Sequence, residues 1–209
     1  MNSLAVLAGI VTGDEAKQVM HSLLTDHDLI QVTIYFRYYL NQALNKAGLG
    51  DELLDHLQVW KEQMALGLTT WAERPEPSRS DCHAWGSSPN IEFYRIILGV
   101  DSDAPGFGKV CIAPNLGTLK KVSGIVPHPL GDIAVDYEVD KKGKLIATID
   151  LPETIKGTFV WKGQNYPLVS GHQVLTLNQQ TPAGQRTYYV SSSTGNDSND
   201  GLTPKRAFK

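Results

Sequence analysis

The sequence predicts an α+β multidomain chain in which a helical part precedes antiparallel strands. Before Gly99, apolar residues recur at the three- and four-residue spacing of amphipathic helices. After Gly99, apolar and polar residues alternate, as they do in strands with one buried face. From residue 178 onward, the polar segment NQQTPAGQRT is typical of a linker. These three observations predict three parts: residues 1–104, 105–178 and 179–209.

Four segments of the helical part have an apolar stripe. The expected helices cover residues 14–25, 33–47, 51–64 and 89–98. Asp14 is suited to cap the first helix, Gly48 ends the second, and Pro89 fits the first turn of the last. Because only residues 48–50 separate the second helix from the third, residues 33–66 should form an antiparallel hairpin.

The strand part has one clear hairpin. Residues 133–139 alternate between apolar and polar side chains, Asp140-Lys141-Lys142-Gly143 makes a turn, and residues 145–151 alternate back. Shorter strands are expected at 109–113, 158–161 and 173–177. A segment of this length can form a small antiparallel β-sandwich. Beyond it, Tyr188-Tyr189-Val190 should form a short strand that has no partner in the chain, so we expect both chain ends to be cut.

Composition excludes several classes of protein. The 209 residues are 41% hydrophobic and carry 19 basic and 22 acidic side chains, for a formal net charge of −3. This balance argues against a nucleic-acid-binding protein. No apolar run reaches the ~18 residues of a membrane span. We therefore expect neither nucleic acid nor a membrane as a partner.

The loop between the third and fourth helices, residues 67–88, has the residues of a sugar site. It is long for a helix connection, and long loops in compact domains often carry function. It contains Trp71, Glu73, His83 and Trp85. Aromatic faces stack on the C–H faces of sugars, and carboxylates move protons at a glycosidic oxygen. The alternative interpretation is a solvated, charged loop held in place by its two tryptophans.

Several short segments of the sequence resemble the C-terminal part of bacterial α-L-rhamnosidases. They are TTWAE at 69–73, SRSDCHAWGSSP at 78–89, EFYRIILGVDSDAPGFGKVCIAPNLGTL at 92–119 and VPHPLGDIAVDY at 126–137, together with TIYFRYYL at 33–40. The resemblance covers about residues 2–177. Members are inverting glycoside hydrolases in which a β-sandwich follows a six-hairpin (α/α) barrel. The resemblance therefore implies that residues 1–104 are the last helices of such a barrel.

The resemblance also implies roles for particular residues. Glu73 corresponds to the family's general base, which takes a proton from the water that attacks the anomeric carbon. His83 corresponds to a histidine that contacts the sugar. Trp71 and Trp85 are expected to wall the pocket and Tyr35 to reach the sugar, with packing in the protein core as the alternative for all three.

This sequence departs from the family pattern in two respects. Many members follow the base with Arg-Trp-Asp, whereas Arg74-Pro75-Glu76 stands here, which affects the outer subsite. The family's general acid lies upstream, on helices that this chain does not contain. The implied function is thus the C-terminal part of an enzyme that hydrolyses terminal α-L-rhamnosyl linkages with inversion. We expect the chain alone to be inactive.

Two rival functions are compatible with the same residues. A non-catalytic carbohydrate-binding or structural module needs only the aromatic platforms, and a six-hairpin glycosidase could act on another sugar. The expected partner is a rhamnose-containing glycan or glycoside. No cofactor or metal is expected, since Cys82 and His83 lack the spaced pairs of a zinc site. Cys82 and Cys111 are either two buried thiols or a disulfide.

The end of the chain has a resemblance of its own. TYYVSSSTGNDSNDGLTPKRAFK, residues 187–209, is similar to the start of right-handed parallel β-helix domains in secreted polysaccharide-degrading enzymes. Together the two resemblances imply pectin degradation, because rhamnogalacturonan contains rhamnose. The opening residues lack the basic region of a signal peptide. From the family we expect the parent protein to be periplasmic or extracellular.

Overall fold

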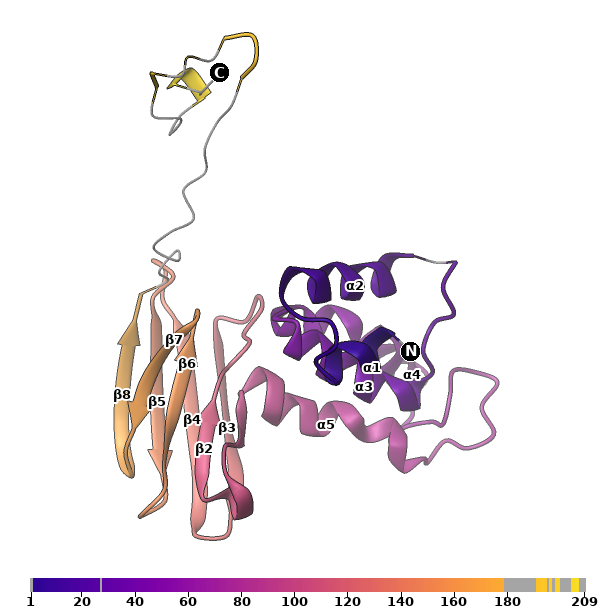
Figure 1. Ribbon diagram of the computed structural model, residues 1–209. Coiled ribbons are helices and arrows are strands. Elements are labelled where there is room, and N and C mark those ends of the chain that lie inside the picture. Colours follow the sequence, from indigo (N-terminus) through magenta and orange to yellow (C-terminus); the bar gives the residue numbers. More distant parts are fainter. Residues whose placement is uncertain are drawn as a thin grey trace. The chain divides into compact units, whose positions relative to one another are not determined.

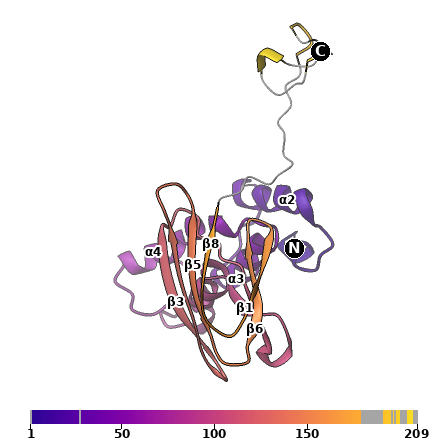
Figure 2. The same ribbon diagram turned by 90° about the vertical axis from the view of Figure 1, so that its left-hand side faces the viewer.

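The computed structural model describes residues 2–26, 28–178, 191–194, 196, 198–199 and 204–206. The chain forms two compact units, Met1–Leu177 and Asn178–Lys209. In the first unit the helices lie beside the sheets (Figure 1), and they lie behind the sheets when these face the viewer (Figure 2). In the described part of the second unit there is one short 3-10 helix, η5 (Pro204–Arg206). The strand expected at 188–190 lies outside the described residues.

The first helices enclose a small apolar core. They are α1 (Asn2–Leu7), α2 (Gly13–Thr25) and α3 (Ile34–Lys46). The expected helix at 51–64 is divided at Leu57 into a 3-10 helix, η1 (Gly50–His56), and α4 (Gln58–Ala65). Val6, Met20 and Leu44 are almost fully buried where α1, α2 and α3 meet. Among the described residues, no helix combines the length and the apolar character that a membrane crossing requires.

The last helix of this part contains a π-helical turn. A 3-10 turn, η2 (Ala84–Ser87), leads into α5 (Ser88–Glu92), which continues as the π-helical segment η3 (Phe93–Ile97). At its end the Leu98 amide donates to the Phe93 carbonyl at 2.9 Å, a bond that spans five residues. Gly99 then turns the chain at φ +73°, and a Cβ there would lie 2.1 Å from the Ala113 carbonyl carbon. Only glycine fits this connection between helix and strand.

Two four-stranded sheets share one apolar core, in which Tyr137, Ile149 and Phe159 are fully buried. The first sheet has the order β1-β2-β6-β7 and the second β3-β4-β5-β8. The strands are β1 (Val100–Ser102), β2 (Lys109–Ile112), β3 (Lys121–His128), β4 (Gly131–Val139), β5 (Leu145–Leu151), β6 (Lys156–Trp161), β7 (Gln164–Leu168) and β8 (Gly171–Leu177). A short 3-10 turn, η4 (Pro105–Phe107), lies between β1 and β2.

The structure differs from the expected β-sandwich in two details. The strands β2 and β6 pair in parallel, so the first sheet is not wholly antiparallel. The first strand, β1, begins at Val100 and pairs with β2, which places it before the expected boundary at residue 105. The expected hairpin is present as β4 and β5, and in its turn Asp140 Oδ1 accepts the Lys142 and Lys144 amides at 2.8 Å each. The described helices do not by themselves show a six-hairpin barrel, which stays a prediction.

Polar contacts join the helices to the sheets within the first unit. The buried Tyr137 hydroxyl on β4 donates to the Leu98 carbonyl at 2.8 Å, at the end of η3. Asn115 Nδ2 donates to the Ile96 carbonyl at 3.0 Å, and the Gly117 amide donates to Asp51 Oδ1 at 2.9 Å. These bonds hold the helical part in one orientation against the β unit.

Candidate functional site

The site is built on the loop between α4 and η2, whose two legs are bonded to each other. The Glu73 amide donates to the Ser80 carbonyl at 2.9 Å, and the His83 amide donates to the Trp71 carbonyl at 2.8 Å. The Trp60 indole anchors the end of the loop by donating to the Gly86 carbonyl at 2.7 Å. These hydrogen bonds hold the loop in one conformation against the helical part.

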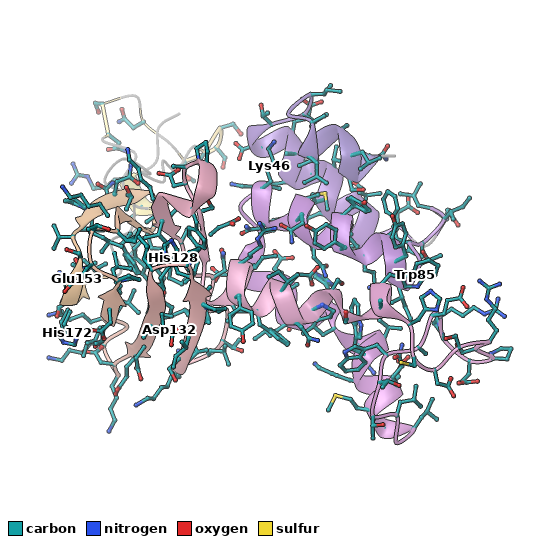
Figure 3. The ribbon with its side chains drawn as sticks, turned by 90° about the horizontal axis from the view of Figure 1, so that it is seen from below. Lys46, Trp85, His128, Asp132, Glu153 and His172 are labelled. Atoms are coloured by element: carbon teal, nitrogen blue, oxygen red, sulfur yellow. The ribbon has the colours of Figure 1, made fainter. Side chains whose placement is uncertain are left out.

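Figure 3 places this region away from the sheets. Trp85 lies at one end of the molecule's first unit, and Asp132, Glu153 and His172 of the β unit lie at the other. The side chains that surround Trp85 come from α3, the loop and the segment η2–α5. The β unit therefore supports the helices and adds no side chain to this site.

Glu73 forms a two-point ion pair with Arg79 across the loop. Arg79 Nε lies 2.5 Å from Glu73 Oε2, and Arg79 Nη2 lies 2.6 Å from Oε1. The Glu73 side chain is only 11% exposed, whereas that of Arg79 is 73% exposed. The hydrogen bonds from Arg79 lower the pKa of Glu73, with smaller help from the charges of Arg79, His83 and Arg74 and against the effect of burial. The carboxyl is therefore ionised at neutral pH, as a proton acceptor must be.

Aromatic rings gather beside the backbone of Glu73. The His83 and Trp85 ring centroids are 4.0 Å apart, and the Tyr35 and Trp85 centroids are 5.2 Å apart. The Trp85 indole also donates to the Glu73 carbonyl at 3.4 Å. The structure thus brings together four of the residues expected at the site, which come from α3, the loop and η2.

A hollow of about 380 Å³ opens next to Trp85, and we call it the aromatic groove. It is lined chiefly by Tyr35, Tyr38, Tyr39 and Trp85, with the polar residues Ser88 and Asn90. Its rings are accessible, since Tyr35 is 46% and Trp85 is 40% exposed. Flat aromatic walls with a few hydroxyl and amide groups suit a sugar ring.

Trp71 lies elsewhere. It packs on the buried cluster that contains Ile34, Leu53 and Trp60, and it does not line the aromatic groove. A Cβ on Gly86 would come within 2.8 Å of the Trp71 Cβ, so the two residues pack closely. Trp71 is partly buried in this packing, and its role at the sugar stays a prediction.

Sequence reasoning did not single out Arg79 as a site residue, and it missed Glu92. Glu92 on α5 is fully buried and accepts a hydrogen bond from Asn41 Nδ2 at 2.8 Å. Burial raises the pKa of Glu92 to about 7. A glutamate on the inward face of a predicted helix is unusual enough to have been a signal.

The cysteines form neither of the two expected arrangements. Both are free thiols; Cys82 is exposed and Cys111 is partly buried. In the described part of the chain, groups of three or more His, Cys, Asp or Glu side chains that could hold a metal ion are not found.

Comparisons with known proteins give the family of the β unit. Residues 99–175 match the family described as the bacterial alpha-L-rhamnosidase C-terminal domain. No curated protein matches the chain.

Solved structures extend the similarity to the helical part. The GH78 family rhamnosidase of Bacillus sp. GL1 is 29% identical with a TM-score of 0.69, over 76% of this chain and 18% of that chain. The alpha-L-rhamnosidase of Aspergillus terreus is 19% identical with a TM-score of 0.67, over 78% of this chain and 21% of that one. The Streptomyces avermitilis alpha-L-rhamnosidase, solved with L-rhamnose, is 16% identical with a TM-score of 0.67, over 78% and 19%.

The helices and sheets together thus have the fold of a part of a rhamnosidase, a class of glycoside hydrolase. The chain spans about a fifth of the length of these enzymes. Residues 99–175 thus match the C-terminal domain of bacterial alpha-L-rhamnosidases, and the chain as a whole is similar to a portion of a solved rhamnosidase.

Proposed function

We propose that this chain is the C-terminal part of an enzyme that hydrolyses terminal α-L-rhamnosyl linkages with inversion at the anomeric carbon. The observation that supports this most directly is the ionised carboxylate of Glu73, whose backbone carbonyl accepts the indole N–H of Trp85 in the aromatic groove, in a chain that matches the rhamnosidase C-terminal domain. On this proposal the helices up to Ile97 are the last ones of a six-hairpin barrel.

Glu73 is the general base of the proposed reaction. Each of its carboxylate oxygens accepts one N–H from Arg79 and keeps a further lone pair for a water molecule. The carboxylate takes a proton from that water as the water attacks the anomeric carbon. The general acid belongs to another part of the longer enzyme, ~6.5–9.5 Å from the base so that the water fits between them.

His83, Trp85 and Tyr35 bind the sugar in this proposal. An imidazole N–H of His83 donates to a rhamnose hydroxyl, and the rings of Trp85 and Tyr35 pack on C–H faces of the sugar. The partner is a rhamnose-containing glycan or glycoside. We extend the proposal to a periplasmic or extracellular parent protein that acts on pectin, supported by the resemblance of residues 187–209 to β-helix enzymes.

Replacement of the base tests the proposal in the complete enzyme. We expect Glu73→Gln to lower kcat at least ~10²-fold with little change in substrate affinity, because the amide cannot accept the proton. Glu153→Gln is the matched control, since Glu153 is an exposed carboxylate of the β unit, away from the loop (Figure 3). Near-normal turnover of Glu73→Gln would remove Glu73 from the mechanism.

Binding without cleavage is a second candidate function, favoured by the four aromatic rings with which this chain lines the aromatic groove. The isolated chain would then bind rhamnose-terminated glycans, and Trp85→Ala would abolish that binding. Tyr94→Ala, which alters an exposed ring outside the groove, is the control and should leave it unchanged. Failure of the wild-type chain to bind any glycan on an array would exclude this candidate.

A further inference from the structure

A pair of buried polar residues joins α3 to α5 beneath the aromatic groove. Asn41 on α3 is 1% exposed and Glu92 on α5 is 0% exposed. Asn41 Nδ2 donates to Glu92 Oε2 at 2.8 Å. The other oxygen of each residue, Asn41 Oδ1 and Glu92 Oε1, is buried without a well-aligned hydrogen-bond partner in the described structure, and so is the hydroxyl of Ser88, one turn before Glu92. The Ser88 hydroxyl acts on the Glu92 carboxyl and favours its ionised form. Buried oxygens of this kind are costly, because water would otherwise solvate them.

Among the described residues, Glu92 forms no ion pair, so no positively charged side chain would balance an ionised Glu92 carboxylate. The cations on the elements packed against α5 are Arg37 and Lys46 on α3 and Arg95 on η3. Arg37 lies 5.9 Å from the centroid of the Trp60 ring, Lys46 donates to the Leu7 carbonyl, and Arg95 pairs with Asp101. The remaining titratable side chains on these elements are phenols: Tyr35, Tyr38, Tyr39 and Tyr94. A buried carboxylate without a cation is unstable relative to its neutral form.

We propose that Glu92 is a neutral carboxylic acid whose Oε1–H donates to Asn41 Oδ1. With the bond from Asn41 Nδ2 to Oε2, this makes a closed ring of two hydrogen bonds between the two side chains. One proton then satisfies both of the unpartnered oxygens. Burial favours the same protonated form and raises the pKa of Glu92 to about 7, against the hydrogen bonds from Asn41 and Ser88, which lower it.

The two hydrogen bonds between Asn41 and Glu92 join α3 to α5, the two helices that line the aromatic groove. Tyr35 and Tyr38 line the groove from α3, and Ser88 and Asn90 line it from α5. Ser88 lies one turn before Glu92 on the same helix face, so the hydrogen bonds between Asn41 and Glu92 lie directly below the groove. Glu92 is thus a positioning residue for the groove, whether or not the chain takes part in rhamnoside hydrolysis.

The protonated pair of Glu92 and Asn41 makes the free energy of unfolding depend on pH in a defined range. The unfolded chain has an ordinary glutamate, with a pKa of about 4.3. Because the folded pKa is higher, the folded state holds the proton between these two values and the unfolded state does not. The protonation of Glu92 therefore contributes fully to the free energy of unfolding at pH values below the ordinary pKa. This contribution falls as the pH rises to about 7 and does not change further at higher pH.

Carboxyl NMR of the wild-type chain tests the proton directly. With glutamate labelled at its side-chain carboxyl carbon, we expect the Glu92 resonance to titrate near pH 7. Titration of Glu92 near pH 4 would overturn the proposal, and it is the result expected if a buried water rather than a proton satisfies the two oxygens. This measurement needs no variant and so does not depend on whether one folds.

Glu92→Gln tests the geometry, because the amide of glutamine can donate to Asn41 Oδ1 in place of the acid proton. Urea denaturation of this variant should give nearly the same midpoint at pH 5 and pH 7.5, whereas Glu153→Gln, which keeps Glu92, serves as the control for replacing a glutamate elsewhere. The wild type and Glu153→Gln should both lose stability over that range. A Glu92→Gln variant that keeps the wild-type loss would overturn the proposal.

Discussion

Arg79 decides the protonation state of Glu73. Two N–H groups in a fork meet the two carboxylate oxygens at 2.5 and 2.6 Å, which is the geometry that an arginine provides and a lysine does not. The guanidinium is largely exposed, so the pair gives Glu73 its charge and orientation rather than much stability to the fold.

We therefore expect Arg79→Gln to raise the pKa of Glu73 toward its ordinary value, measured by carboxyl NMR on this chain. Since Glu73 accepts a proton only when ionised, the acidic limb of the parent enzyme's pH–rate profile should move to higher pH. Arg74→Gln is the control and should give a smaller shift, because Arg74 contributes the weakest of the charges acting on Glu73. An unchanged pKa in Arg79→Gln would contradict this role.

Most of the individual residues that the structure brings together at the site were predicted from the sequence of a single loop. Glu73, His83 and Trp85 occur within thirteen residues, and Tyr35 was expected from its helix. Their roles stay predictions. The partner of Glu73 could not be predicted, because Arg74 and Arg79 are equivalent until the bond from Glu73 to Ser80 folds the loop back on itself.

At the scale of elements, the regular spacing of apolar residues predicted some segments and concealed others. The strand β3 was missed because it presents Ile125 and Pro127 outward and Gly124 inward, which removes the alternation. The strand β7 contains Pro167, and β1 has only three residues. The break at Leu57 was hidden because the apolar stripe continues through it.

The connection at Gly99 should tolerate no side chain. We expect Gly99→Ala to destabilise the chain by at least about 2 kcal/mol more than Gly106→Ala, measured by urea denaturation. Both glycines have positive φ, so both variants lose about 1 kcal/mol to backbone strain. Only at Gly99 does the new Cβ collide with backbone atoms, whereas at Gly106 nothing lies within 4 Å. Equal losses in the two variants would contradict this account.

At the scale of the whole first unit, helices and sheets should unfold together. The buried bond from Tyr137 to the Leu98 carbonyl is one of the contacts that couple them. We expect Tyr137→Phe to cost about 1–3 kcal/mol, because a buried carbonyl is left unpaired. Circular dichroism and tryptophan fluorescence should still give one coincident transition. Tyr166→Phe is the control, since its hydroxyl makes no hydrogen bond within the described residues. Two separate transitions in the wild type would show that the parts are independent.

The parallel pairing of β2 with β6 has a consequence for biosynthesis. All of β3, β4 and β5 lie between these two strands in the chain, and those three pair with one another as soon as they are made. At a synthesis rate of ~5–20 residues per second, the free edge of β2 therefore stays open for a few seconds after it leaves the ribosome. An open strand edge is a template for pairing with other chains. Of all strands in the two sheets, β2 waits longest for its second neighbour, and at that stage the nascent protein is most exposed to aggregation and most dependent on chaperones.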